Sequence, residues 1–173
     1  MSTTLPEQGV PLVKFLTSAG GSIQVTSNNL ANGLDYFYEP PPGYGFIVHS
    51  LCVQIADNAN FNQIDYGGIA GGLVNGLSFW LNSNGVDVPL LAAQVVKRNL
   101  DWARISPNVD LTQWAGLSQT LIVNLDTDAR FGLPLTLSSV NSDQIILRTK
   151  DDFTSLVDHT FALGGVLFPL SLL

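Results

Sequence analysis

The chain has 173 residues and a formal net charge of −7 at pH 7, and only 12% of its residues are charged while 46% are hydrophobic. Soluble domains usually carry about 25% charged residues, so uncharged polar side chains must cover much of this surface, and we expect other protein to bury it. We expect no nucleic-acid binding, because phosphate contacts need clustered Lys and Arg and the seven basic residues here are scattered.

Short segments rich in Val, Ile, Phe, Tyr and Thr recur roughly every ten residues between clusters of Gly, Pro and Asn. Long amphipathic helices are missing from this pattern. We therefore predict an all-β fold, a jelly-roll-like antiparallel β-sandwich. Its expected strands are residues 13–17, 22–26, 35–38, 46–56, 76–81, 119–125, 134–137, 144–149 and 159–167.

The length suits a single domain with its own core, which we divide into three parts. Residues 1–34 are predicted to form an N-terminal arm or hairpin, residues 35–168 the β-sandwich, and residues 169–173 an apolar C-terminal tail. Residues 82–85, Asn-Ser-Asn-Gly, offer the positive-φ positions of a tight hairpin. Residues 90–99 are compatible either with a short helix or with a strand over 94–100.

Two features are predicted to lie in interfaces with other subunits. The apolar end of the chain would expose several side chains unless they dock on a neighbour or seal the sandwich, and these are Phe168, Leu170, Leu172 and Leu173. Lys97 and Arg98 form the only adjacent basic pair, which is typical of a solvated edge or of interface ion pairs. No secretion signal or membrane span is recognisable, so we expect neither secretion nor membrane insertion.

The sequence carries no recognisable catalytic motif. Its histidines are His49 and His159, and its single cysteine, Cys52, is interpreted as a buried, inert thiol. His49 and Cys52 lie three positions apart in one predicted strand, so strict alternation would send them to opposite faces. We therefore expect no enzymatic activity and no cofactor.

Acidic and amide side chains cluster in several predicted turns. Asp151 and Asp152 are expected to open a short helical turn that ends at Leu156, with Asp151 as its cap, and Asn75 and Gly76 are expected to form another turn. Oxygen-rich runs such as residues 57–60 and 126–128 could hold Ca²⁺, but none has the complete calcium-loop pattern. Capping is the favoured interpretation, and no metal site is predicted.

The tryptophans leave two interpretations open. Trp80, Trp102 and Trp114, together with nearby tyrosines, could form a stacking platform for a sugar on one edge of the sandwich. Large amphipathic rings are also common in cores and at subunit contacts, which is the interpretation we favour.

Three short motifs, in this order along the chain, resemble those of a group of small virion proteins from tailed bacteriophages. They are L-x-N-G at Leu73, Asn75 and Gly76, N-x-D-W at Asn99, Asp101 and Trp102, and D-D-x-T-x-L at Asp151, Asp152, Thr154 and Leu156. The similarity spans roughly residues 40–168. Val74, where a polar residue is expected, and the apolar tail depart from the pattern. The resemblance implies a jelly-roll-like subunit of the particle without enzymatic activity.

The composition and the resemblance together predict a virion structural protein. We expect a capsid decoration or cement subunit that binds the major capsid protein and itself, as a trimer or, as second choice, a dimer. It would be assembled in the cytoplasm of the host bacterium and be located in the virion. The alternative is a carbohydrate- or receptor-binding module of a phage tail or spike.

Overall fold

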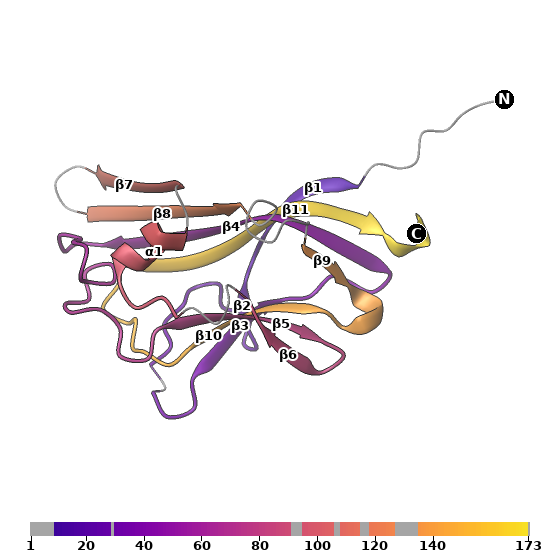
Figure 1. Ribbon diagram of the computed structural model, residues 1–173, viewed down its shortest axis with the longest axis horizontal. Helices are drawn as coiled ribbons and strands as arrows, with labels where there is room; N and C mark the ends of the chain where they lie inside the picture. Colours follow the sequence, from indigo (N-terminus) through magenta and orange to yellow (C-terminus); the bar gives the residue numbers. More distant parts are fainter. Residues whose placement is uncertain are drawn as a thin grey trace.

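The computed structural model describes residues 9–28, 30–90, 95–105, 108–114, 118–126 and 135–172. They form two antiparallel β-sheets that pack face to face as two layers, sheet A and sheet B (Figure 1). Short helical segments are α1 (Asn99–Ile105) and the 3₁₀ turns η2 (Ser139–Asn141) and η3 (Leu170–Leu172).

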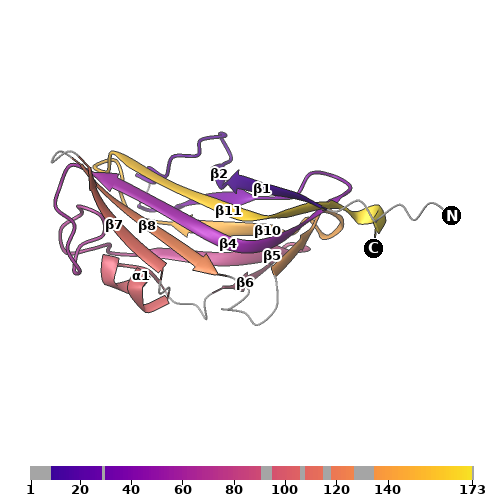
Figure 2. The ribbon, with the colours of Figure 1, turned by 90° about the horizontal axis from the view of Figure 1, so that it is seen from above.

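Sheet A runs in the order β1 (Val10–Phe15), β11 (Asp158–Pro169), β4 (Tyr44–Asp57), β8 (Ser118–Asp126) and β7 (Asn108–Trp114). β9 (Leu135–Ser138) pairs with the first part of β4, before the stretch that pairs with β8. Figure 2 shows this layer from above. Sheet B runs in the order β2 (Thr17–Ser18), β3 (Leu34–Tyr38), β10 (Gln144–Thr149), β5 (Leu77–Ser83) and β6 (Val86–Pro89).

The strand pairs are nested along the chain. β1 pairs with β11, β3 with β10, β4 with β8 and β9, and β5 with β6, so successive strands from the two ends of the sequence meet. Such nesting is what results when one long hairpin is rolled into two packed sheets, the jelly-roll arrangement. The predicted all-β, jelly-roll-like sandwich is therefore confirmed.

The core lies between the sheets and is filled from alternating positions of the long strands. In β4, Phe46 and Val48 point inward, whereas further along Leu51, Val53 and Ile55 do so. The change of parity comes from a bulge, because Val48 pairs with Gly165 and Ser50 with Gly164, which leaves His49 as the extra residue. The bulge breaks the alternation that was expected to separate His49 from Cys52.

The N-terminal segment differs from the predicted arm or hairpin. β1 is an edge strand of sheet A, and the chain then crosses to sheet B at Leu16, whose side chain is buried. Residues 22–26 do not form the predicted strand, although Gln24 makes a single bridge to Thr160. The buried Leu16 makes this crossover part of the sandwich. Residues 1–8 lie outside the described residues.

Residues 82–85 and 90–99 are the two remaining segments for which the sequence predicted a local structure. The tight hairpin at residues 82–85 is confirmed, since Asn84 and Gly85 have φ values of 50° and 78° and join β5 to β6. The 90–99 segment contains a single bridge, Val96 to Leu77, and the helix begins only at Asn99, while residues 91–94 lie outside the description. β6, β7 and α1 were not predicted.

Candidate interaction surfaces

The predicted interface residues lie at opposite ends of the sandwich. Lys97 and Arg98 directly precede α1, whereas Phe168 and Leu170 lie at the far end of β11 (Figures 1 and 2). We call the end that carries residues 58–76, the start of α1 and residues 150–157 the loop end. The side chain of Leu172 and residue Leu173 lie outside the description.

Part of the C-terminal tail belongs to the chain's own fold. β11 continues through Phe168 and Pro169, which pair with Gly45 and Tyr44. The Phe168 ring covers Gly45 so closely that a Cβ atom there would lie 2.4 Å from the ring. The Leu170 N–H donates a hydrogen bond to the carbonyl of Gly43 (2.9 Å). Phe168 and Leu170 are thereby half-buried without any neighbour.

At the loop end, the Asp151 carboxylate is buried against three consecutive backbone amides. The N–H groups of Val74 and Gly76 donate to its two oxygens at 2.7 Å each, and the N–H of Asn75 lies 3.1 Å from both. Consecutive amides that converge on an anion form a nest, and the positive φ of Gly76 (82°) helps to shape it. Asp151 therefore fixes the 74–76 loop rather than capping its own turn.

The cap of the turn after Asp151 is its neighbour. Asp152 accepts hydrogen bonds from the Thr154 amide (3.0 Å) and hydroxyl (2.6 Å), and these bonds lower the pKa of Asp152. Phe153 and Leu156, on the apolar side of this turn, are buried. The segment forms a turn and not a helix.

The N-x-D-W motif fixes the loops on the other side of the loop end. The Asn99 side chain accepts from the Gly67 amide (2.8 Å) and donates to the Asn62 carbonyl (2.7 Å). Asp101 accepts the amides of Lys97 and Arg98 at 2.9 Å each. Trp102 is fully buried in the core. All three motifs thus meet at the loop end and hold its backbone in place.

A buried polar pair lies beneath these loops. His159 Nε2 is 2.8 Å from the Tyr66 hydroxyl, and both side chains are packed among aromatic rings, including Phe153 and Phe161. Burial lowers the pKa of His159 to about 3 and raises the pKa of Tyr66 well above its usual value. His159 Nδ1 has no hydrogen-bond partner among the described residues. The imidazole is therefore neutral and closed off from solvent.

The outer face of sheet A carries a groove of about 350 Å³ whose lining is uncharged. It is lined by Val13, Phe15, Ser50, Cys52, Gln54, Asn124, Thr160, Ala162 and Gly164. Val13 and Phe15 are 67% and 44% exposed. Cys52 is half-buried in this groove and not in the core, and burial raises the pKa of its thiol.

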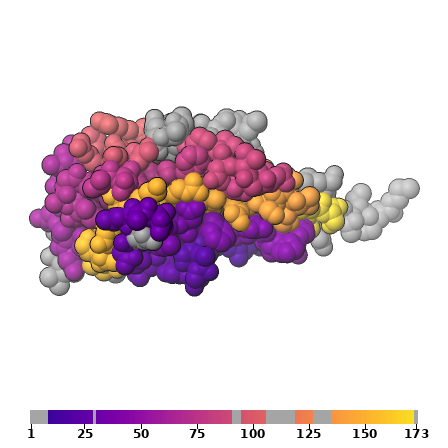
Figure 3. All heavy atoms as spheres, turned by 90° about the horizontal axis from the view of Figure 1, so that it is seen from below, coloured from indigo at the N-terminus to yellow at the C-terminus, as the bar shows by residue number. Residues whose placement is uncertain are grey.

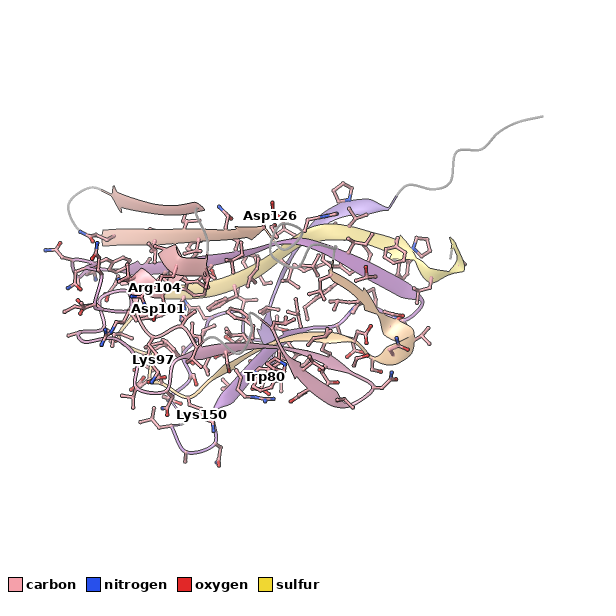
Figure 4. All side chains as sticks on the ribbon, viewed as in Figure 1. Trp80, Lys97, Asp101, Arg104, Asp126 and Lys150 are labelled. Atoms are coloured by element: carbon pink, nitrogen blue, oxygen red, sulfur yellow. The ribbon has the colours of Figure 1, made fainter. Side chains whose placement is uncertain are left out.

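Trp80 lies on the outer face of sheet B (Figure 4), the layer that is turned toward the viewer in Figure 3. The Arg148 guanidinium carbon lies 5.3 Å from the centre of the Trp80 ring, and Arg148 is paired with Asp35 (2.9 Å) and Asp87 (3.2 Å). Trp102 is in the core, so it cannot share a platform with Trp80. The Trp114 side chain lies outside the description.

The described residues contain no group of three or more His, Cys, Asp or Glu side chains placed to hold a metal ion. Within the same part of the chain, no helix has the length and apolar character needed to cross a membrane. No protein-family model, curated protein or solved structure matches this chain.

Proposed function

We propose that this chain is a structural subunit of a virus particle, a decoration or cement subunit that binds between copies of the major capsid protein. Jelly rolls occur in viral capsid proteins and also in lectins, so the fold is compatible with the proposal without selecting it. The support for the proposal comes from the outer faces of the two sheets.

The uncharged groove on the outer face of sheet A is the observation that carries the proposal. Its groove exposes Val13 and Phe15 beside amide and hydroxyl side chains, and none of the described residues that line it is charged. Protein interfaces are depleted of charge at their centre, because an uncharged surface can be buried without stripping water from ions. A capsid surface is the partner that we assign to this face.

The alternative, a carbohydrate- or receptor-binding module, depends on Trp80 alone among the described tryptophans. One face of the Trp80 ring is covered by Arg148, and Trp102 is buried in the core. A sugar platform usually needs accessible aromatic faces. The surfaces therefore favour the structural subunit.

The test is the copy number of this chain in purified particles, combined with two matched variants. A decoration subunit should be present in numbers comparable to the major capsid protein, whereas a tail or spike module should be present in few copies. Val13→Asp should abolish incorporation, because it places a charge in the groove. Val86→Asp changes a valine of similar exposure, 61% against 67%, on β6 and should have no effect. A low copy number, or equal incorporation of both variants, would contradict the proposal.

A further inference from the structure

Val74 protrudes at the loop end with three basic side chains around it. It is 81% exposed, the largest exposure among the described large hydrophobic residues, although its amide is held by buried Asp151. We call Val74, Lys97, Arg98 and Lys150 the basic loop patch. Figure 4 shows Lys97 and Lys150 on this end of the molecule.

The three basic residues lie against the Val74 loop through different atoms: Lys97 through its ammonium group, Arg98 through its stem and Lys150 through its backbone carbonyl. Lys97 Nζ donates to the Val74 carbonyl at 2.7 Å, and a Cβ atom at Gly72 would lie 2.9 Å from Cγ of Arg98. Asn75 donates from its side chain to the Lys150 carbonyl at 3.0 Å. The backbone of Lys150 and the side chains of Lys97 and Arg98 are therefore fixed relative to the Val74 loop.

Two of the acidic groups nearest to this patch, Asp101 and Asp151, accept backbone amides, whereas Asp152 is exposed and bonds Thr154. The Asp151 carboxylate is buried and accepts backbone amides, and Asp101 accepts the amides of Lys97 and Arg98 and faces Arg104. Four of the chain's seven basic residues, Lys97, Arg98, Arg104 and Lys150, thus lie at one end of a molecule whose net charge is −7. The loop end also carries Asp65, Asp101, Asp151 and Asp152, so the end as a whole is not basic. The exposed cations Lys97, Arg98 and Lys150 beside Val74 are what favours contact with an acidic surface of another molecule.

The outer face of sheet B provides such an acidic surface. Asp35, Glu39 and Asp87 lie there, on or just after strands β3 and β6, and Arg148 is the basic residue among them. Hydrogen bonds from Asn82 and Arg148 lower the pKa of Asp87, which keeps it ionised. Trp80 and Arg148 lie at the centre of this face, and Trp and Arg are the residues most often found as interface hot spots.

We propose that the chain associates with itself head to tail, the basic loop patch of one copy docking on the outer face of sheet B of the next. Val74 would contact the Trp80 region, and Lys97, Arg98 and Lys150 would face Glu39, Asp35 and Asp87. Such a contact uses two different surfaces, so it closes into a ring when the rotation between copies permits. It leaves the groove on sheet A free for the capsid, and it deepens the proposed function by assigning the contact between neighbouring subunits.

The first test compares two valines of equal exposure in the isolated chain. Val74→Asp should weaken self-association about tenfold or more in sedimentation experiments at low salt, because it replaces the apolar contact with a charge and offsets the positive charge of the basic loop patch. Val140 is 79% exposed in η2, away from the loop end, and Val140→Asp should leave association unchanged. Both residues are exposed, so the variants should keep the melting temperature of the parent.

The second test reverses the charges. One double variant carries Lys97→Glu and Lys150→Glu, and a second carries Glu39→Lys and Asp87→Lys. Each double variant should lose self-association. A chain that carries all four substitutions should recover it. Added salt should weaken the parent assembly. A parent chain that stays monomeric at low salt, equal behaviour of the two valine variants, or no recovery in the fourfold variant would overturn the proposal. None of these outcomes bears on the copy number in particles, so the two proposals can fail separately.

Discussion

At the scale of single residues, Asp151 explains why the loop end has a defined shape. A buried carboxylate usually needs a cation, yet this one is satisfied by the amides of residues 74–76. The positive φ of Gly76 and the exposed position of Val74 both follow from this geometry. The residue that shapes the basic loop patch is thus hidden beneath it.

Replacing Asp151 with Ala should lower the free energy of unfolding by roughly 2–4 kcal/mol, because three amides lose a charged acceptor at a buried site. Chemical denaturation would measure the loss. Asp152→Ala is the matched control and should cost much less, since Asp152 is exposed and bonds only Thr154. Calcium should not change the melting temperature of the parent. A calcium-dependent rise that disappears in Asp151→Ala would show instead that Asp151 is a metal ligand.

At the scale of elements, the end of β11 shows how the chain accommodates an apolar terminus. Gly45 on β4 has no side chain, and the Phe168 ring occupies that space on the neighbouring strand. The pairing of Phe168 with Gly45 extends the β4–β11 ladder to Pro169. What was expected to be a separate tail from residue 169 is therefore partly a strand.

Gly45→Ala should destabilise this end by roughly 1–3 kcal/mol, because the new Cβ would overlap the Phe168 ring and overpack the contact. The backbone of Gly45 is not at positive φ, so strain of the main chain does not contribute. In a Phe168→Ala background the same substitution should cost much less, and the double-mutant cycle measures this coupling. Gly20→Ala is the control, since its new Cβ would lie 3.8 Å from Oγ of Ser18, an ordinary contact distance. Equal costs in both backgrounds would show that the two residues are not coupled.

At the scale of the whole molecule, the sandwich could be predicted because its long strands carry their own pattern. β4, β5, β8, β10 and β11 are apolar runs between turn residues, and Asn84 and Gly85 mark a hairpin by composition alone. β6 was missed because it has only four residues, all exposed, and α1 because seven residues cannot establish a helical period.

The features that shape the surfaces could not be predicted, because each depends on residues far apart in the sequence. Asp151 binds amides about 75 positions earlier, and the bulge at His49 appears only in the pairing with Gly164 and Gly165. The motif residues indicated that Asp151, Asn75 and Gly76 matter, but not that they contact one another. The basic pair Lys97 and Arg98 and the apolar tail were each predicted to lie in interfaces, but their sequence did not indicate that the fold places them at opposite ends (Figure 1).

The stability of the whole molecule should depend on pH through His159. Its pKa is about 3 in the fold because the imidazole is buried, against an ordinary value of 6.5 in the unfolded chain. The unfolded state therefore binds a proton below pH 6.5 that the folded state does not. The stabilisation is complete above that pH and is lost as the pH falls toward 3, by about 1.4 kcal/mol for each pH unit.

His159→Gln removes this titration while retaining a group that can bond the Tyr66 hydroxyl. Its unfolding free energy should be lower than that of the parent at neutral pH, since Gln packs less well among Phe153 and Phe161, and the difference should shrink on acidification. Denaturation curves measured from about pH 7 to 4 would show whether the unfolding free energy of the parent depends more steeply on pH than that of His159→Gln. Parallel curves for the parent and His159→Gln would mean that His159 takes up a proton in the folded protein, and hence that water reaches the aromatic core beneath the loop end.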